Sequence, residues 1–256
     1  MREHQPQTLR ALLLVLLVCM SLVLVAACSQ EDPRTMTQEV LLEGTDMATK
    51  AYTYDTGLPG KTIVVVGGIH GNETAGFQAA EVLNEDPWSL ISEGVIHFIP
   101  SAHTQAIAAD LRYPKETMDL NRAFLGEGDH QPTLDLAKAI RTWVVDKQPD
   151  FVIDHHESLD SYKNGRLGNT LILADAGENL FEGLVMVDLV NPLLDVDLPF
   201  IMESSPPVGS FNKTLSEEDG LLVVTIETNR KLPLEERVDQ QLIIAKELIR
   251  HYSQGD

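Results

Sequence analysis

The segment that most restricts the fold is a short apolar run, Thr62–Val66, which ends at the glycine pair Gly67 and Gly68. A β-branched run of this length bounded by glycines indicates a buried strand that ends in a sharp turn. His70 and Glu73 follow the turn, where the next helix is expected to begin, and their spacing points both side chains the same way. A converging imidazole and carboxylate provide two of the three protein ligands of a catalytic zinc site. A third ligand must come from elsewhere in the chain.

A second strand-like run, residues 151–154, ends in the polar sequence Asp154-His155-His156. Side chains alternate along a strand, so Asp154 and His156 share one face while His155 lies on the other. His156 is therefore the candidate third ligand, and Asp154 is placed to orient a ligand or a substrate group. The alternative is that both histidines are ordinary residues at a strand end.

A third motif contains two arginines, because Arg112 is followed by the sequence Asp119-Leu120-Asn121-Arg122. A guanidinium binds a carboxylate through two parallel hydrogen bonds, and an asparagine amide adds a further donor. Asn121 and Arg122 thus suit a substrate carboxylate, and Arg112 suits the carbonyl oxygen under attack. The alternative is a surface arginine paired with Asp119.

The fourth motif is the hydrophobic run 222–226, which is followed directly by Glu227. An unpaired charge at the end of a buried strand is costly, so an idle carboxylate is not expected there. Glu227 fits the general base that deprotonates a zinc-bound water.

The four motifs, in this order, resemble the zinc carboxypeptidase superfamily, and in particular its succinylglutamate desuccinylase/aspartoacylase branch. The family pattern is Gly-Gly-x-His-Gly-x-Glu, then an Arg followed by Asp-Leu-Asn-Arg-x-Phe, an Asp-Leu-His strand end and a late Thr-Ile-Glu. The similarity extends over about residues 61–237. It implies one Zn²⁺ ion per chain, bound by His70, Glu73 and His156.

The resemblance also implies roles for the remaining motif residues. Arg112 is expected to stabilise the oxyanion, Asn121 and Arg122 to hold a substrate carboxylate, and Glu227 to act as the catalytic base. The implied activity is that of a zinc-dependent hydrolase, which cleaves an amide bond next to a carboxylate in an N-acyl amino acid or small peptide. The alternatives are a zinc metallocarboxypeptidase that acts on peptides and a non-catalytic zinc-binding lipoprotein.

Three positions depart from the family pattern. His155 replaces the usual Leu before the third ligand. His103 stands where relatives commonly have Asn, so it either touches the substrate or has a structural role. The segment 199–220 contains Phe200 and Phe211 but no Tyr, whereas peptide-cleaving carboxypeptidases place a substrate-binding Tyr in that region. This last departure argues against true peptidase activity.

Strand-like and helix-like runs alternate along the chain, and this predicts a three-layer α/β domain with ligands at the carboxyl ends of its strands. The predicted strands are residues 62–66, 95–99, 151–154, 170–173 and 222–226, and the predicted helices are 74–84, 133–145, 177–189 and 234–252. The resemblance adds that the sheet is mixed, mostly parallel, and flanked by helices. We expect one catalytic domain, residues 46–256.

The N-terminus has the features of an export signal. Arg2 and Arg10 precede an apolar run, residues 11–25, and small residues follow it before Cys28. The run is shorter than the roughly 20 apolar residues of a spanning helix, which favours its removal. The sequence Val-Ala-Ala-Cys that ends at Cys28 resembles a bacterial lipobox, in which the cysteine is lipidated.

We therefore expect a signal peptide at residues 1–27, a polar tether at 28–45 and a lipid anchor on Cys28. The protein would be an exported bacterial lipoprotein on the outer, extracytoplasmic side of the cell membrane. The alternatives are a plain signal peptide cleaved near Ala27 and an uncleaved membrane anchor.

The net charge of the chain is -20, which should repel nucleic acid, so no nucleic-acid partner is expected. Against this acidic background, Arg112 and Arg122 form a local positive site for an anionic substrate.

Overall fold

The computed structural model describes residues 32–175 and 179–254. The chain divides into residues 1–33 and a compact unit that runs from Arg34 to Asp256, to which every element below belongs. The predicted signal peptide and the predicted lipidation site, Cys28, lie outside the described residues. Within the described ranges, no helix combines the length and the apolar composition that crossing a bilayer requires.

The middle layer is a mixed sheet in which the described strands follow the order β1-β2-β4-β3-β5-β8-β6-β7. Their bounds are β1 Thr35–Leu41, β2 Thr49–Asp55, β3 Thr62–Val66, β4 Val95–Ile99, β5 Phe151–Ser158, β6 Thr170–Ile172, β7 Ile201–Glu203 and β8 Val223–Asn229. The central strands β4, β3, β5 and β8 are parallel, as are β6 and β7. The β1–β2, β2–β4 and β8–β6 pairs are antiparallel. The predicted mixed, mostly parallel sheet is confirmed.

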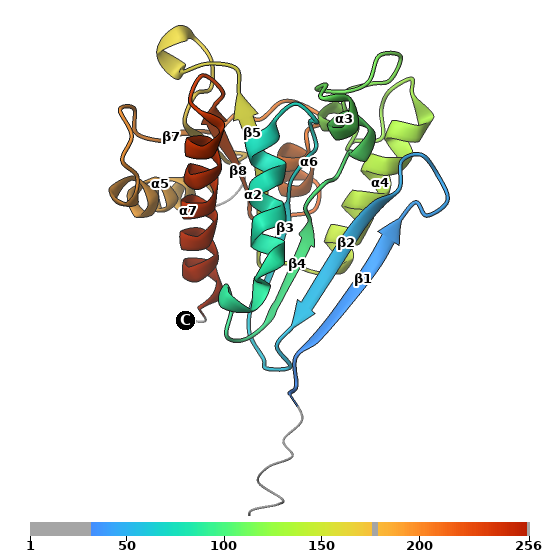
Figure 1. Cartoon of the computed structure of the whole chain (residues 1–256), viewed down its shortest axis with the longest axis horizontal. Helices are drawn as coiled ribbons and strands as arrows, with labels where there is room; N and C mark the ends of the chain where they lie inside the picture. The colour runs from blue at the N-terminus through green and yellow to red at the C-terminus, as the bar shows by residue number, and fades with distance from the viewer. Residues whose placement is uncertain (1–31, 176–178, 255–256) are drawn as a thin grey trace, which may run out of the picture. The chain divides into compact units, whose positions relative to one another are not determined.

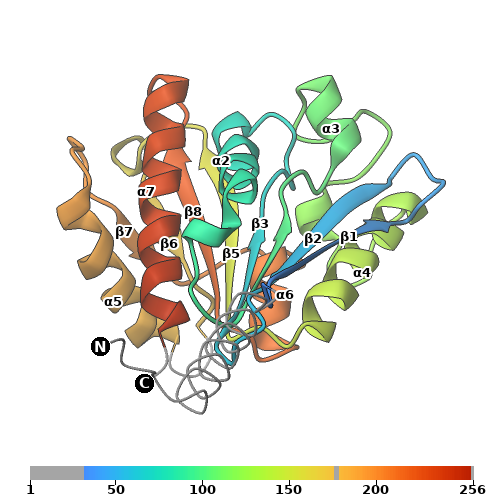
Figure 2. The same cartoon turned by 60° about the horizontal axis from the view of Figure 1, so that its bottom comes forward.

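Helices cover both faces of this sheet. They are α2 Thr74–Glu85, α3 Thr104–Ala109, α4 Gln131–Asp146, α5 Asn179–Val190, α6 Phe211–Glu217 and α7 Leu234–Ser253, with short 3₁₀ turns at Pro87–Ser89, Leu120–Arg122, Tyr162–Asn164 and Asn191–Leu193. Helices α2 and α7 lie side by side over one face (Figure 1). Helix α5 lies beside α7, and α4 lies against the β1–β2 hairpin at the other end (Figure 2).

Alternation along the central strands supplies two hydrophobic cores. In β3, Ile63 and Val65 pack with residues of α2, α5 and α7, whereas Val64 and Val66 pack with residues of α4 and α6. Burying one such side chain stabilises the fold by about 1.5–3 kcal/mol. Because both faces are covered, the central strands appear in the sequence as continuous apolar runs.

The domain begins earlier than the sequence indicated. Residues 35–41, assigned above to the polar tether at 28–45, form β1 and pair with β2 along their whole length. The predicted boundary at residue 46 is therefore wrong. Strand β1 is an almost fully exposed edge strand. It is held by backbone hydrogen bonds and by contacts such as the one from Trp143 Nε1 to Glu39 Oε1, 3.1 Å, so it carries no apolar pattern.

Elsewhere the predicted elements agree with the structure to within a few residues. The strands at 62–66 and 95–99 have the predicted bounds, whereas β5 continues past residue 154 to Ser158. This extension arises because β5 stays paired with β8 as far as Asn229. It places the polar end of β5 inside the sheet rather than in a loop.

Candidate metal centre and active-site cavity

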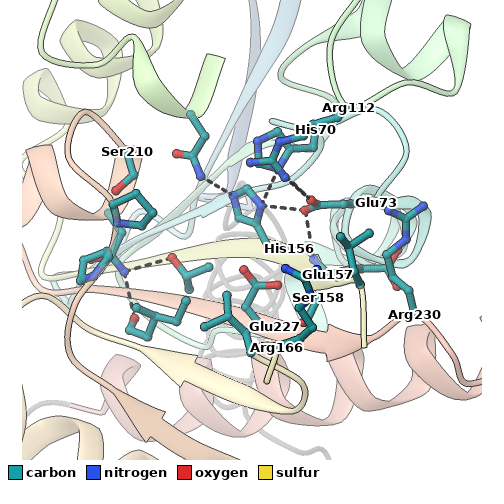
Figure 3. Close-up of a pocket in the computed structure, with 18 of the residues that line it drawn as sticks. His70, Glu73, Arg112, His156, Glu157, Ser158, Arg166, Ser210, Glu227 and Arg230 are labelled. Carbon is teal, nitrogen blue, oxygen red and sulfur yellow. Dashed lines mark hydrogen bonds and ion pairs between the residues drawn. The ribbon is translucent and has the colours of Figure 1, made fainter. Parts of the chain in front are cut away.

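His70, Glu73 and His156 come together where β3 and β5 end (Figure 3). Nδ1 of His70 lies 3.0 Å from Nδ1 of His156 and 2.9 Å from Glu73 Oε1. Nδ1 of His156 lies 2.7 Å from Glu73 Oε2. The three residues are 2%, 4% and 2% exposed. The structure thus brings the three predicted ligands into one buried cluster.

The loop after β3 requires glycine at two positions. Gly68 has a φ of +73°, in the left-handed region, and a Cβ at Gly71 would lie 1.9 Å from the carbonyl carbon of Ala106 in α3. The loop therefore turns sharply and passes directly against α3. This path leaves His70 facing β5 and places Glu73 as the N-cap residue of α2.

Each histidine is held by a carboxylate on its other ring nitrogen. His70 Nε2 lies 3.0 Å from Asp119 Oδ1, and His156 Nε2 lies 3.2 Å from Asp154 Oδ2. An ionised carboxylate only accepts, so each Nε2 carries a proton, and in the neutral form of each ring the Nδ1 then presents a lone pair. Two lone pairs 3.0 Å apart repel unless a proton or a cation lies between them. A positive charge between the two Nδ1 atoms would therefore stabilise the site.

The pKa values agree with this picture. Burial raises the pKa of Glu73, but the charges of His70 and His156 outweigh it and hold the pKa well below its usual value. Burial lowers the pKa of His156, but Asp154 and Glu73 outweigh it and raise the pKa well above its usual value. A proton on His156 thus supplies the positive charge that a cation bound by these ligand atoms would provide.

The donor set also fits zinc in kind and spacing. Two imidazole nitrogens and one carboxylate oxygen are typical ligands of catalytic zinc. Ligand atoms on a tetrahedral ion with bonds near 2.05 Å are about 3.3 Å apart. The two imidazole nitrogens, 3.0 Å apart, need only a small outward movement to match this spacing.

His155 lies on the opposite face of β5, as the strand alternation predicted. Its Nδ1 is 2.6 Å from Gln241 Oε1 on α7, and Gln241 Nε2 donates to the carbonyl of His156 at 2.6 Å. Burial lowers the pKa of His155 to about 4, so the ring is neutral. His155 joins the sheet to α7 and does not line the cavity.

Glu227 lies at the end of β8, where it lines the same cavity as the metal cluster. The side chain is 8% exposed, and its Oε2 has no hydrogen-bond partner among the described residues. Burial, reinforced by the negative charge of Glu73, raises the pKa of Glu227 to about 8. A buried carboxylate with a free oxygen and a raised pKa is suited to proton transfer.

Arg112 also lines the cavity, but its guanidinium is engaged there. Its Nη1 donates to Glu73 Oε1 at 3.2 Å, and its Nε and Nη2 each lie 3.0 Å from Asp119 Oδ2. The pairing with Asp119 raised above as an alternative is therefore present. A guanidinium has five N–H donors, so two remain for another acceptor.

Asn121 and Arg122 lie in the short turn before residue 123. The Asn121 Oδ1 accepts a hydrogen bond from the Phe211 N–H at 2.8 Å, which turns its Nδ2 towards His156 Nε2, 3.5 Å away. The exposed Arg122 donates from Nη1 to the Asn121 carbonyl at 2.5 Å. Both residues line the cavity, and the Arg122 guanidinium, with five N–H donors in all, keeps others for an acceptor.

The cavity has a volume of about 470 Å³, within the usual range for small-molecule sites. All seven predicted metal, catalytic and substrate-binding residues line it. Other residues that line the cavity were not predicted from the sequence, among them Asn72, Glu157, Leu159, Arg166, Leu167, Ile172, Pro206, Pro207 and Arg230. Glu157 directly follows the proposed ligand His156 in the sequence, and this adjacency could have indicated that Glu157 lies at the cavity. Arg166 and the prolines lie in loops without a recognisable pattern.

Glu157 anchors the helix that begins at Glu73. Its Oε2 accepts a hydrogen bond from the Ala75 N–H at 2.9 Å, and its Oε1 forms a buried ion pair with Arg237 of α7. The Glu157 N–H donates to Glu73 Oε2 at 3.0 Å. Glu157 therefore positions the Glu73 carboxylate directly, through its N–H, and indirectly, by holding the first turn of α2.

His103 does not line the cavity and has a structural contact. It is the N-cap residue of α3, where its Nδ1 accepts from the Ala106 N–H at 3.4 Å. Burial, with a further contribution from His70, lowers its pKa to about 4. Of the two roles considered from the sequence, the structure supports the structural one.

Comparison with known proteins agrees with the fold and with the motifs. Residues 59–251 match the family model of the succinylglutamate desuccinylase/aspartoacylase catalytic domain. No curated protein gives a significant match.

Solved structures share the fold at low sequence identity. A succinylglutamate desuccinylase from Silicibacter sp. TM1040 is 18% identical with a TM-score of 0.68, over 89% of this chain and 70% of that protein. An aspartoacylase family protein from Mesorhizobium loti is 20% identical with a TM-score of 0.64, over 87% and 68%. The product-bound cell shape determinant protein Csd4 from Helicobacter pylori is 15% identical with a TM-score of 0.65, over 86% and 55%. The chain thus spans about half the length of Csd4.

Proposed function

Because the chain belongs to the succinylglutamate desuccinylase/aspartoacylase catalytic-domain family, we propose that it is a zinc-dependent hydrolase that cleaves an amide bond next to a substrate carboxylate. The proposed substrates are N-acyl amino acids or small peptides. The observation that carries the proposal is that three metal-ligand atoms and the unpartnered carboxylate of Glu227 share one cavity.

His70 Nδ1, the Glu73 carboxylate and His156 Nδ1 would hold one zinc ion per chain. When bound, zinc supplies Lewis-acid chemistry, which polarises a carbonyl group and lowers the pKa of a water molecule towards 7. Asp119 and Asp154 keep both histidines in the tautomer that this role requires, through their contacts with Nε2.

Glu227 is proposed as the general base and then the general acid. Its carboxylate accepts a proton from the attacking water while the water oxygen bonds to the carbonyl carbon. When the C–N bond breaks, Glu227 donates that proton to the leaving amine nitrogen. Positive charge at the three ligands favours the ionised form of Glu227 that the first step needs.

Two further roles, oxyanion stabilisation and carboxylate binding, are proposed for Arg112 and for Asn121 with Arg122. The two spare donors of Arg112 stabilise the negative charge that develops on the carbonyl oxygen. Asn121 Nδ2 and the Arg122 guanidinium bind the carboxylate on the amine side of the scissile bond. An N-acyl amino acid carries such a carboxylate on the carbon next to the amide nitrogen, and so does the C-terminal residue of a peptide.

A metallocarboxypeptidase that acts on peptides is the second candidate. It is favoured by the similarity to Csd4, which is described as a D,L-carboxypeptidase and has been solved with mDAP and with a tripeptide. A non-catalytic zinc-binding protein is a weaker candidate, because it has no use for a buried base beside the metal ligands.

The test is a hydrolysis screen of N-acyl amino acids and short peptides by the purified protein. The screen is run on the protein as isolated, after removal of metal with a chelator, and after zinc is added back. We expect amine release that is lost with the chelator and restored by zinc, and the relative rates distinguish a deacylase from a carboxypeptidase. A protein with stoichiometric zinc that hydrolyses none of these compounds would contradict the proposal.

The location proposed for the protein rests on its N-terminal sequence. The apolar run and the Val-Ala-Ala-Cys sequence support an exported bacterial lipoprotein, anchored through Cys28 on the outer side of the membrane. The acidic net charge argues against a nucleic-acid partner.

A further inference from the structure

The chain enters the catalytic domain at the end of the sheet that lies opposite the active site. Thr35, the first residue of β1, pairs with Asp55, the last residue of β2. The pairing of β2 with β4 and of β4 with β3 continues this level to Thr62, where β3 begins. His156 and the cavity lie at the other end, where the parallel strands finish. In Figure 1, β1 begins at the bottom of the view, whereas the arrow of β5 ends at the top.

The start of β1 also limits the chain between the domain and the proposed lipid anchor. Cys28 is seven residues before Thr35. A fully extended chain of this length spans at most about 25 Å. A lipid on Cys28 would therefore hold Thr35 within about 25 Å of the bilayer surface. We call the end of the domain that contains Thr35 the tether end.

So short a tether excludes an orientation with the cavity against the bilayer. Helix α7 follows β8 and runs from the cavity end to the tether end, where Tyr252 stacks on Phe151, the first residue of β5. Its 20 residues span about 30 Å. With the cavity on the membrane, Thr35 would lie about this far from the surface, which is beyond the reach of the tether.

Helix α5 presents apolar side chains to solvent near its start. It packs on the domain through residues such as Gly183 and Met186, which are buried. Phe181 and Leu184 are 66% and 60% exposed, and Leu180 beside them is also exposed. In the described ranges, no other Phe, Tyr or Trp side chain is as exposed as Phe181. The first turns of α5 thus leave an apolar surface uncovered.

Contacts with α7 place this apolar surface at the tether end. Glu182, the neighbour of Phe181, accepts a hydrogen bond from the Tyr252 hydroxyl at 2.5 Å. The Tyr252 ring stacks on Phe151, with the ring centroids 4.3 Å apart. Phe151 in turn pairs with Ile63, next to the start of β3. The first turn of α5 therefore lies at the same end of the sheet as the attachment point of the tether.

A lipid bilayer is the partner that fits this surface. Exposed apolar patches mark contacts with proteins or membranes, and such side chains insert between lipid headgroups and acyl chains. The net charge of -20 gives no attraction to anionic headgroups, so the contact has to be apolar. The tether raises the effective concentration of the bilayer at this end. A few apolar side chains can then maintain a contact that they could not maintain on a free protein.

We propose that the domain rests on the membrane through Phe181 and Leu184 at the start of α5, with the active-site cavity open to the aqueous side. The inference rests on the lipid anchor proposed above and not on the hydrolytic activity. For the proposed function it means that substrates reach the cavity from water. Water-soluble amides are then substrates, and amides embedded in the bilayer are not.

Introduced cysteines test the orientation. The chain has two cysteines, of which Cys19 lies in the expected signal peptide and Cys28 would carry the lipid. A new thiol in the lipidated protein can therefore be labelled selectively. Leu184→Cys places a fluorophore on the proposed contact surface, and Leu159→Cys places it just after β5, at the cavity end. The two leucines form a matched pair, because they are 60% and 59% exposed.

The lipidated protein is bound to phosphatidylcholine vesicles that contain a lipid with a nitroxide quencher at its headgroup. We expect a loss of fluorescence and a shift to shorter wavelength for Leu184→Cys, and no effect of the quencher on Leu159→Cys. Equal quenching at both positions, quenching at neither, or quenching of Leu159→Cys alone would overturn the orientation. Circular dichroism of both labelled proteins controls for folding.

A second set of variants separates apolar contact from the effect of the tether alone. The fluorophore is moved to Leu58→Cys, an exposed position in the loop before β3 at the tether end. Replacing Phe181 and Leu184 together by Ser should reduce the quenching at this position. Replacing Leu193 and Val208 by Ser removes exposed apolar side chains elsewhere and should leave it unchanged. Unchanged quenching in the first variant would overturn the contact through α5.

Mass spectrometry of the same preparations shows whether Cys28 carries a lipid. An unmodified Cys28 would overturn the anchor and, with it, the inference. Hydrolysis is not measured in any of these experiments, so a failure of the proposed hydrolase activity and a failure of the proposed orientation are distinguishable.

Discussion

His156 and Glu227 are register partners in the parallel pairing of β5 with β8. Because side chains in register on neighbouring parallel strands lie on the same face of the sheet, the proposed metal ligand and the proposed base are held side by side. Asp154 and Thr225 repeat this relationship two residues earlier, where Thr225 Oγ1 donates to Asp154 Oδ2 at 3.1 Å. The geometry of the site thus depends on backbone hydrogen bonds of the central sheet.

Replacing the proposed base should separate chemistry from metal binding. Glu227→Gln keeps the shape of the side chain but cannot accept a proton from water at neutral pH. We expect kcat to fall roughly 10²–10⁴-fold, while zinc content and substrate affinity stay close to wild type. Steady-state kinetics and metal analysis on the same preparation provide the check. Wild-type turnover of a confirmed substrate by this variant would refute the mechanism.

Arg122→Ala should act mainly on substrate binding. The exposed Arg122 guanidinium is proposed to hold the amine-side carboxylate in the ground state, so its loss should raise KM by roughly 10- to 100-fold with a smaller change in kcat. The effect should be confined to substrates that carry this carboxylate, and the corresponding carboxamide serves as the control. A drop in kcat alone would assign Arg122 to the transition state instead.

The two adjacent histidines should differ in metal binding. His156→Ala removes the buried Nδ1 atom that is proposed to bind the metal, so it should abolish stoichiometric zinc. His155→Ala alters only the contact with Gln241 on the other face of β5, so folded protein should retain the metal. Zinc is measured by elemental analysis on monomeric, folded fractions, with thermal unfolding as the control for stability. Retention of zinc by His156→Ala and its loss from His155→Ala would reverse the assignment.

The stability of the metal-free protein should depend on the ionisation of Glu227. Its pKa is about 8 in the fold against the ordinary value of 4.5, so between these values the folded carboxyl keeps a proton that the unfolded chain releases. The contribution is present below about pH 4.5 and is lost as the pH rises towards about 8. Glu227→Gln cannot ionise and should lose less stability over this range. Urea unfolding of both proteins with chelator present, from about pH 5 to about pH 8.5, measures the difference.

Cys28→Ala tests the proposed lipid anchor. Without the thiol the chain cannot be lipidated, so the protein should accumulate unprocessed or leave the membrane fraction. Mass spectrometry of the mature N-terminus and partitioning into detergent provide the measurements. An unchanged mass and unchanged partitioning would exclude lipidation at this cysteine.

Much of the site was predictable because its signals are local. His70 and Glu73 are three residues apart beyond a glycine turn, and the face of His156 follows from strand alternation. Strong apolar runs marked the central strands, since both of their faces are buried. Strand β1 gave no such signal, because an exposed edge strand is held by backbone hydrogen bonds to β2 rather than by its side chains.

The sequence by itself determined the central strands and the glycine turn, because each depends on residues close together in the chain. Its separate motifs, with the family resemblance, also indicated the proposed metal ligands and base. Only the tertiary structure decided which distant residues complete the site. Asp119 meets His70 Nε2, and Arg166 and Arg230 reach the cavity from separate loops. These contacts depend on the order and register of strands far apart in sequence, and no local pattern of polarity encodes that order.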